Sequence, residues 1–162
     1  MSETPIRIER ATERDVPLIL ELITALSVYE RLAHEVTATE EQLRKTLFGP
    51  NPSAEVLIGY AGDEPAGFAL FFPNYSTFLG KPGIHLEDLF VKPEWRGHGF
   101  GRQLLERLAA IAVERDCGRL EWTVLDWNEP AIGFYKKLGA TPMDAWKIMR
   151  VTGDALHKLA GS

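Results

Sequence analysis

A glycine-rich segment is the first part of the chain whose residue types and spacing indicate chemistry. The six residues R-G-H-G-F-G, 96–101, follow an apolar run and precede a stretch with helical periodicity. At such a strand-to-helix turn, unpaired backbone N–H groups and the helix dipole can bind an anion. Glycine also lets the backbone approach a phosphate closely. A plain strand-to-helix turn is the alternative interpretation.

The spacing of these glycines differs from two common phosphate-binding motifs. A dinucleotide-binding fingerprint requires G-x-G-x-x-G and an acidic residue about 20 positions later. Here the glycines run G-x-G-x-G. A P-loop requires G-x-x-x-x-G-K-[ST], and no Lys-Ser or Lys-Thr pair follows Gly101. Neither motif therefore describes this segment.

Two neighbouring carboxylates are the second chemical signal. Glu87 and Asp88 interrupt the apolar run I-H-L-E-D-L-F-V, residues 84–91. Burying a charge is costly, so acidic residues inside an apolar strand favour a functional role over a solvated or capping one. Because neighbouring side chains of a strand point to opposite faces, we expect only one of the two to face a given site.

The elements that must position these residues follow from hydrophobic periodicity. Alternating runs predict strands and 3.6-residue spacing predicts helices, while residues 73–83 are interpreted as an aromatic loop. This order favours an α/β or α+β fold around one mixed sheet, with the helix after the glycines packed on its face. The predicted strands are 6–10, 55–61, 66–72, 84–91, 119–125 and 145–151, and the predicted helices are 13–27, 39–48, 99–116 and 129–138.

Length and composition are typical of one globular domain, residues 1–162. Of the 162 residues, 45% are hydrophobic and 25% charged, which is ordinary for a domain with a single core. No apolar run approaches the roughly 18 residues of a membrane span, and the start, Met1–Arg10, is too polar for a signal peptide. We therefore expect a cytoplasmic protein without a membrane partner.

The numbers of cysteines, histidines and charged residues indicate which kinds of ligand to expect. Cys117 is the single cysteine, and the four histidines lack a paired metal-binding spacing, so we expect no disulfide and no metal. The formal net charge of −5 argues against a nucleic-acid partner, which usually meets a basic patch. The same charge suits a cationic partner.

Several motifs together resemble one family. The segment R-G-x-G-x-G resembles the pyrophosphate loop of the GNAT superfamily of N-acetyltransferases, and the resemblance covers nearly the whole chain. Within the superfamily the chain looks most similar to the diamine (spermidine/spermine) and thialysine N-acetyltransferases. The stretches that carry this resemblance are V-Y-E, L-E-D-L-F-V, L-D-W-N and W-N-E-P-A-I-G-F-Y-K-K-L-G-A.

The resemblance implies a fold, a reaction and an assembly. The GNAT fold is a central mixed, mostly antiparallel twisted sheet with helices on both faces. The reaction would transfer acetyl from acetyl-coenzyme A, as cosubstrate, to a primary amine of a small cationic acceptor by direct attack in a ternary complex. That acceptor would be a diamine, a polyamine or a lysine-like amino acid. Relatives of this kind usually form homodimers.

The resemblance also assigns roles to residues. Glu87 would be the water-linked base, and Tyr135 would protonate the coenzyme A thiolate. Asp88 would assist acceptor binding or hold the structure together. A core aromatic is the alternative role for Tyr135, and a helix cap the alternative for Asn128. By resemblance, coenzyme A would contact Leu89, Phe90, Val91, Arg96, Gly97, His98, Gly99, Phe100, Gly101, Arg102, Asn128, Ala131 and Tyr135.

The acceptor end of the site is assigned in the same way. Tyr29 and Glu30 resemble the pair that receives the far amine of diamines, although they could equally be a solvated helix corner. Asp144 and Trp146 resemble a glutamate and a tryptophan of the family, in a segment that is a few residues shorter here. His85 stands where the family usually has tyrosine, which leaves room for a changed substrate.

Two other functions remain open at this point. A coenzyme-A-binding sensor could keep the fold without turnover, and retention of both Glu87 and Tyr135 disfavours it. A protein or peptide amine acetyltransferase would share the mechanism but need a peptide groove. The predicted 73–83 loop could help to build either kind of acceptor site.

Overall fold

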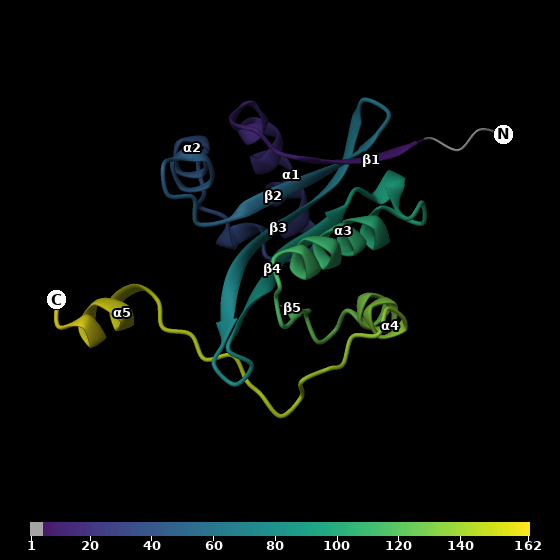
Figure 1. Ribbon diagram of the computed structural model, residues 1–162. Helices are drawn as coiled ribbons and strands as arrows, with labels where there is room; N and C mark the ends of the chain where they lie inside the picture. The colour runs from purple at the N-terminus through teal and green to yellow at the C-terminus, as the bar shows by residue number, and fades with distance from the viewer. Residues whose placement is uncertain (1–4) are drawn as a thin grey trace. The chain divides into compact units, whose positions relative to one another are not determined.

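The computed structural model describes residues 5–162 and divides into two compact units, one ending at Thr123 and one from Val124 to Ser162. The first unit contains a five-stranded sheet of order β1-β2-β3-β4-β5 (Figure 1). Its neighbours pair antiparallel except β4 and β5, which are parallel. The mixed, mostly antiparallel sheet is therefore confirmed. The strands are β1 Ile6–Arg10, β2 Glu55–Ala61, β3 Glu64–Ser76, β4 Lys81–Val91 and β5 Leu120–Trp122.

Helices cover both faces of this sheet. On one face, α1 (Val16–Tyr29) and α2 (Glu40–Phe48) bury their apolar sides in a core shared with β2, β3 and β4. On the other face lies α3 (Phe100–Glu114), in front of the sheet in Figure 1. Local capping fixes where α2 begins, since Thr39 and Gln42 form a capping box there. Thr12 and Asp15 form another at the short 3₁₀ turn Glu13–Asp15, which precedes α1. The GNAT-type arrangement expected from the sequence is thus confirmed.

The hairpin between β3 and β4 is longer than predicted. Residues 73–83 were expected to form a loop, but β3 runs to Ser76 and β4 starts at Lys81. The register pairs Asn74 with Gly83 and Ser76 with Lys81. The prediction was wrong because the ladder of backbone hydrogen bonds continues through residues whose composition is typical of a loop.

The second unit differs most from the expectation. It contains α4 (Glu129–Lys137), close to the predicted 129–138, and α5 (Gly153–Ala160), which was not predicted. The predicted strand at 145–151 is wrong, since those residues form neither strand nor helix. Alternating side chains alone do not make a strand without a neighbouring strand for the backbone hydrogen bonds. The predicted strand at 119–125 is shortened to β5, Leu120–Trp122.

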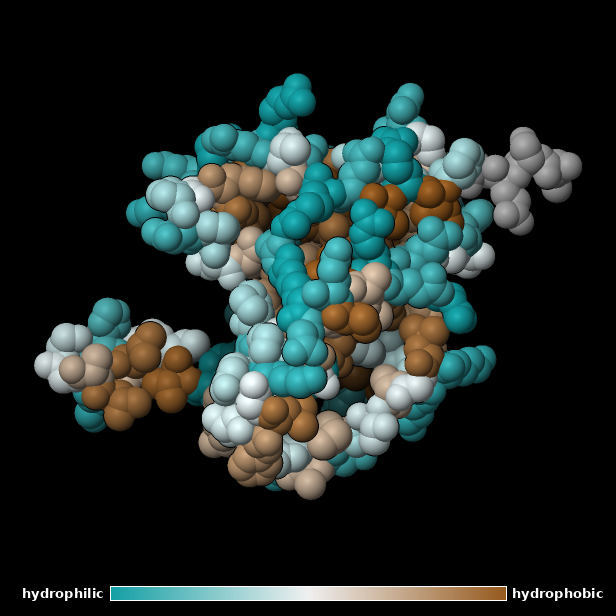
Figure 2. All heavy atoms as spheres, viewed as in Figure 1, coloured by the Kyte–Doolittle hydropathy of each residue, from teal (hydrophilic) through white to brown (hydrophobic). Residues whose placement is uncertain are grey.

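Apolar side chains lie at the surface of the second unit. Leu156 and Leu159 of α5 are 51% and 76% exposed, and Figure 2 shows apolar atoms over this helix. Other exposed apolar residues of the unit are Met143, Trp146, Ile148, Met149 and Val151. Within residues 5–162, none of the helices has both the length and the apolar character to cross a membrane.

Candidate active site

A β-bulge places the two sequence-adjacent carboxylates. Between β3 and β4 the register pairs Leu70 with Asp88 but Phe71 with Leu86, so Glu87 is the extra residue of the bulge. A bulge re-aims the side chains around it and increases the local twist. It is therefore the local feature that sets the directions of the acidic side chains.

The acidic side chains of β4 lie on one face of the sheet. Phe72 and Leu70 share a face of β3, so their partners His85 and Asp88 share a face of β4. Glu87 lies on the same side, because its Oε2 is 3.3 Å from His85 Nε2. The expectation that Glu87 and Asp88 face opposite sides is wrong, since the bulge interrupts strict alternation.

A third carboxylate, at the end of α1, joins this group. Burial first, and then the charges of Glu87 and Glu30, raise the pKa of Asp88 to about 7. The pKa of Glu30 is also raised, first by burial and then by Glu87. Glu30, Glu87 and Asp88 therefore form an electrostatically coupled cluster, which we call the acidic cluster. A bound cation would relieve its repulsion.

Aromatic and cationic side chains lie beside the acidic cluster. Tyr29 precedes Glu30 at the end of α1, and its ring centroid is 6.4 Å from that of Phe90 on β4. The Arg96 guanidinium lies 4.5 Å from the centroid of Tyr29 and 5.8 Å from that of Phe90. Arg96 Nε also donates a hydrogen bond to the Val91 carbonyl at 3.0 Å. The first residue of the glycine segment thus reaches the predicted acceptor residue Tyr29.

The glycine turn has the backbone needed to hold a phosphate. Gly97 and Gly99 have φ values of 81° and 93°, in the left-handed region that favours glycine. Gly99 is the N-cap of α3, and within the described residues no side chain caps this helix. Its first amides and dipole therefore suit an anion.

The side chains around the turn have structural contacts of their own. Phe100 is buried and packs with Ala61, Ala66 and Trp95. His98 Nδ1 lies 3.0 Å from the Arg96 carbonyl oxygen, which accepts its hydrogen bond. Arg102 pairs with Glu106 one turn along α3, at 2.8 Å. Contact with a phosphate would therefore fall mainly to the backbone of this turn.

The end of β4 extends beyond its pairing with β5 in the first unit. Pairing of β4 with β5 ends at Leu86 and Trp122, while β4 itself continues to Val91. Residues 88–91 therefore extend past β5 and pair with β3 alone among the described strands. Leu89, Phe90 and Val91 lie in this stretch, and the Val91 carbonyl is engaged by Arg96.

The second unit holds the remaining predicted residues. Asn128 is buried and its Oδ1 accepts a hydrogen bond from the Ala131 amide at 3.3 Å, so it caps α4. Tyr135 lies on α4 with its ring centroid 5.6 Å from that of Phe134. Asp144 and Trp146 lie between α4 and α5, and Trp146 is 77% exposed.

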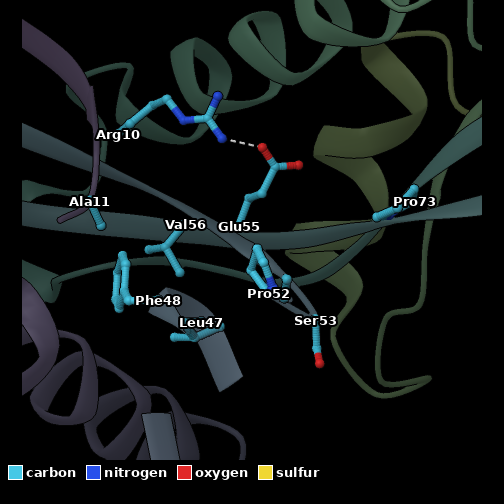
Figure 3. Close-up of a pocket in the computed structure, with 10 residues that line it drawn as sticks. Arg10, Ala11, Leu47, Phe48, Pro52, Ser53, Glu55, Val56 and Pro73 are labelled. Atoms are coloured by element: carbon cyan, nitrogen blue, oxygen red, sulfur yellow. Dashed lines mark hydrogen bonds and ion pairs between the residues drawn. The ribbon is translucent and has the colours of Figure 1, made fainter. Parts of the chain in front are cut away.

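A pocket of about 350 Å³ lies elsewhere in the first unit (Figure 3). Arg10 and Glu55 form an ion pair at its edge, and Arg115 donates two hydrogen bonds of 2.8 Å to Glu55. Hydrogen bonding from Arg115 is the main cause that lowers the pKa of Glu55. Because its carboxylate is matched by two guanidinium groups, we interpret this network as a structural link between β1, β2 and α3. The pocket is lined by Arg10, Ala11, Leu47, Phe48, Pro52, Ser53, Ala54, Glu55, Val56 and Pro73.

Comparison with known proteins decides the family. The model of the acetyltransferase (GNAT) family matches residues 19–140. The chain belongs to the GNAT acetyltransferase family. A GNAT relative, the thialysine N-epsilon-acetyltransferase of Bos taurus, is 39% identical, over 96% of this chain and 98% of that protein. The L-ornithine N5-acetyltransferase NATA1 of Arabidopsis thaliana is 36% identical, over 94% of this chain and 87% of that protein.

Solved structures support the same GNAT fold. An integron cassette protein from the mobile metagenome of V. cholerae superposes with a TM-score of 0.81 at 29% identity, covering 97% of this chain and 98% of the other. The enzyme is thus a GNAT acetyltransferase, and membership implies acetyl-coenzyme A as its cosubstrate. The glycine turn fits the diphosphate of that molecule, since its left-handed glycines and uncapped helix start leave backbone amides for an anion.

Sequence reasoning missed three features of the site. His85 was noted only as a departure from the family, although strand alternation alone places residues 85 and 87 on one side. The contact of Arg96 with Tyr29 joins residues 67 positions apart, and no local pattern signals it. The bulge was likewise missed, because strand register depends on pairing across the sheet.

Proposed function

We propose that this enzyme transfers acetyl from acetyl-coenzyme A to a primary amine of a small cationic acceptor: a diamine, a polyamine or a lysine-like amino acid. The acidic cluster of Glu30, Glu87 and Asp88 carries this proposal. Three coupled carboxylates favour a positively charged ligand over a neutral one. Relatives named for thialysine and ornithine support an acceptor of this class.

The proposed reaction begins with removal of a proton from the acceptor's ammonium group. An alkyl ammonium with a pKa near 10.4 is only about 0.04% neutral at pH 7, so the enzyme must generate the free amine. Carboxylates attract the cation, and Glu87, directly or through a water, accepts its proton. The amine nitrogen then attacks the thioester carbonyl. Asp88 and Glu30 hold the acceptor's charges, and Tyr29 packs along its chain beside Arg96.

The remaining steps concern coenzyme A. We assign its diphosphate to the backbone of the glycine turn and its pantetheine arm to the backbone of Leu89, Phe90 and Val91. Asn128 and Ala131 complete the contacts, and Tyr135 supplies the proton that the departing thiolate takes up. These roles require residues 1–162 to act as one domain, which the family match across 19–140 supports.

We further propose that the enzyme works as a homodimer. The apolar side chains at the surface of the second unit support this, because a second copy would bury them. The measurement is molar mass by sedimentation, for which we expect twice the 18.2 kDa of one chain.

Thiol release from acetyl-coenzyme A, measured over a panel of primary amines, tests the proposed function. We expect release that depends on an added diamine, polyamine or lysine analogue. Binding of acetyl-coenzyme A without turnover of any amine would point instead to a sensor. Turnover restricted to peptide amines would point to a protein acetyltransferase. Either result would contradict the proposal.

A further inference from the structure

A histidine contacts the carboxylate that we assign as the base. His85 Nε2 lies 3.3 Å from Glu87 Oε2, and the His85 side chain is only 21% exposed against 52% for Glu87. The imidazole ring also stacks on Phe72 across the hairpin, with centroids 5.0 Å apart and planes at 33°. Packing on Phe72 therefore holds the ring beside Glu87.

The charged groups that face His85 are mainly acidic. On β4 the neighbour is Glu87, and on β5 the register partner is Glu121. Glu121 Oε1 accepts a hydrogen bond from Asn74 at 2.8 Å and lies 3.5 Å from Arg119 Nε. On β3 the adjacent Phe72 is uncharged, and α1 contributes Glu30, which is coupled to Glu87. A proton taken up by the ring would therefore lie among negative charges.

We propose that His85 is a positioning residue that relays the acceptor's proton from Glu87 to solvent. This inference rests on the proposed function. The N–H bond of the acceptor ammonium breaks, its proton passes through Glu87, and a new N–H bond forms at His85 Nε2. The acceptor is left as the neutral amine, Glu87 remains a carboxylate, and His85 becomes an imidazolium. The imidazolium then gives one proton to water, which matches the one proton that acetylation of an ammonium releases.

The relay would use the difference in basicity between a carboxylate and an imidazole. A carboxylate of ordinary pKa about 4.3 is a far weaker base than an imidazole of ordinary pKa about 6.5. Among model compounds the imidazole is therefore the stronger base by about a hundredfold. The relay matters most near neutral pH, where free amine is scarce, and least near the pKa of the amine itself.

The test compares kcat/KM for the acceptor from pH 6 to pH 9.5 in the wild type and in His85→Gln. Glutamine can still donate a hydrogen bond to Glu87 but cannot take up a proton. We expect kcat/KM to fall about ten- to a hundredfold at pH 7, and the deficit to close as the pH approaches 9.5. The KM for acetyl-coenzyme A should stay unchanged.

The matched control is His34→Gln. His34 also contacts a glutamate, with Nε2 at 3.4 Å from Glu35 Oε1, but its side chain is 74% exposed. We expect its pH profile to follow the wild type. As a second variant, Glu87→Gln should show the same pH-dependent deficit, and the double variant should be no worse than the more impaired single one.

Four outcomes separate the relay from the function on which it rests. A deficit of His85→Gln that is equal at every pH, or no deficit, would overturn the relay while leaving the acetyltransferase proposal intact. Additive effects of His85→Gln and Glu87→Gln would overturn it too. A wild type that acetylates no amine would overturn the proposed function, and the relay with it.

Discussion

The bulge at Glu87 decides which side chains can act together. It turns Glu87 to the side of His85 and Asp88, where Glu30 couples to the same charges. The acidic pair itself could be predicted from the sequence, because charge inside an apolar strand is costly. Its geometry could not, since a one-residue shift of register depends on pairing with a distant strand.

The raised pKa of Asp88 gives a prediction about stability. Between the ordinary carboxyl range near pH 4 and its value of about 7, the folded protein binds the Asp88 proton more tightly than the unfolded chain does. Stability therefore falls as the pH rises through this window. We expect Asp88→Asn to remove that fall, so that it melts higher than the wild type at pH 8 and similarly at pH 4.

Thermal unfolding followed by circular dichroism from pH 4 to pH 8 measures this effect. The gain at pH 8 should be on the order of 1–3 kcal/mol. Asp63→Asn is the matched control, because Asp63 is exposed in the turn between β2 and β3. Parallel pH curves for Asp88→Asn and the wild type would argue against a coupled, partly buried carboxyl.

Tyr135 carries a separate prediction about turnover. Removing its hydroxyl in Tyr135→Phe keeps the ring that packs near Phe134 but takes away the proposed proton donor. We expect kcat to fall about a hundredfold or more, with the Kd of acetyl-coenzyme A unchanged by calorimetry. Tyr75→Phe, at a tyrosine that is 60% exposed, should match the wild type. Equal kcat values in all three proteins would rule out the assigned role.

Among the elements, most helices and the first two strands could be predicted within a few residues, whereas the ends of β3 and β4 and the segment after α4 could not. The helices α1, α2 and α3 and the strands β1 and β2 lie close to their predicted ranges, because apolar spacing sets their buried sides. The strand expected at 145–151 failed for lack of a pairing partner, and α5 was missed beside it. Sequence periodicity thus predicts which side of a helix or strand is buried, but not which other element it pairs with or packs against.

The glycine turn gives a prediction at this scale. Gly99→Ala puts a methyl group at φ 93°, which costs about 1–2 kcal/mol in an L residue. At the start of α3 it should also disturb the amides that hold the diphosphate. We expect a lower Tm and a KM for acetyl-coenzyme A raised about tenfold, from the loss of one or two charge-assisted hydrogen bonds.

Gly62→Ala is the matched control for this turn. Gly62 has φ 62° in the turn between β2 and β3, and an added Cβ there would meet no atom within 4 Å. It should lower the Tm by a similar amount and leave the KM for acetyl-coenzyme A unchanged. If both variants changed the KM equally, the turn before α3 would have no special role in binding the coenzyme.

At the scale of the whole molecule, the net charge and the family membership both favour acetylation of a cationic acceptor. The net charge of −5 attracts cations over a distance set by ionic strength, and the acidic cluster concentrates that charge near the proposed base. GNAT membership supplies the acetyl donor. We therefore propose, as the enzyme's central property, that it selects a cationic amine for acetylation.

Competition between two acceptors of equal length tests this property most directly. The enzyme is given isotope-labelled acetyl-coenzyme A and equal amounts of 1,4-diaminobutane and 4-amino-1-butanol, and the labelled products are quantified by mass spectrometry. We expect the diamine product to exceed the amino-alcohol product about tenfold, because the second ammonium pairs with the acidic cluster. Equal labelling of the two acceptors, or no labelled amine at all, would contradict the account.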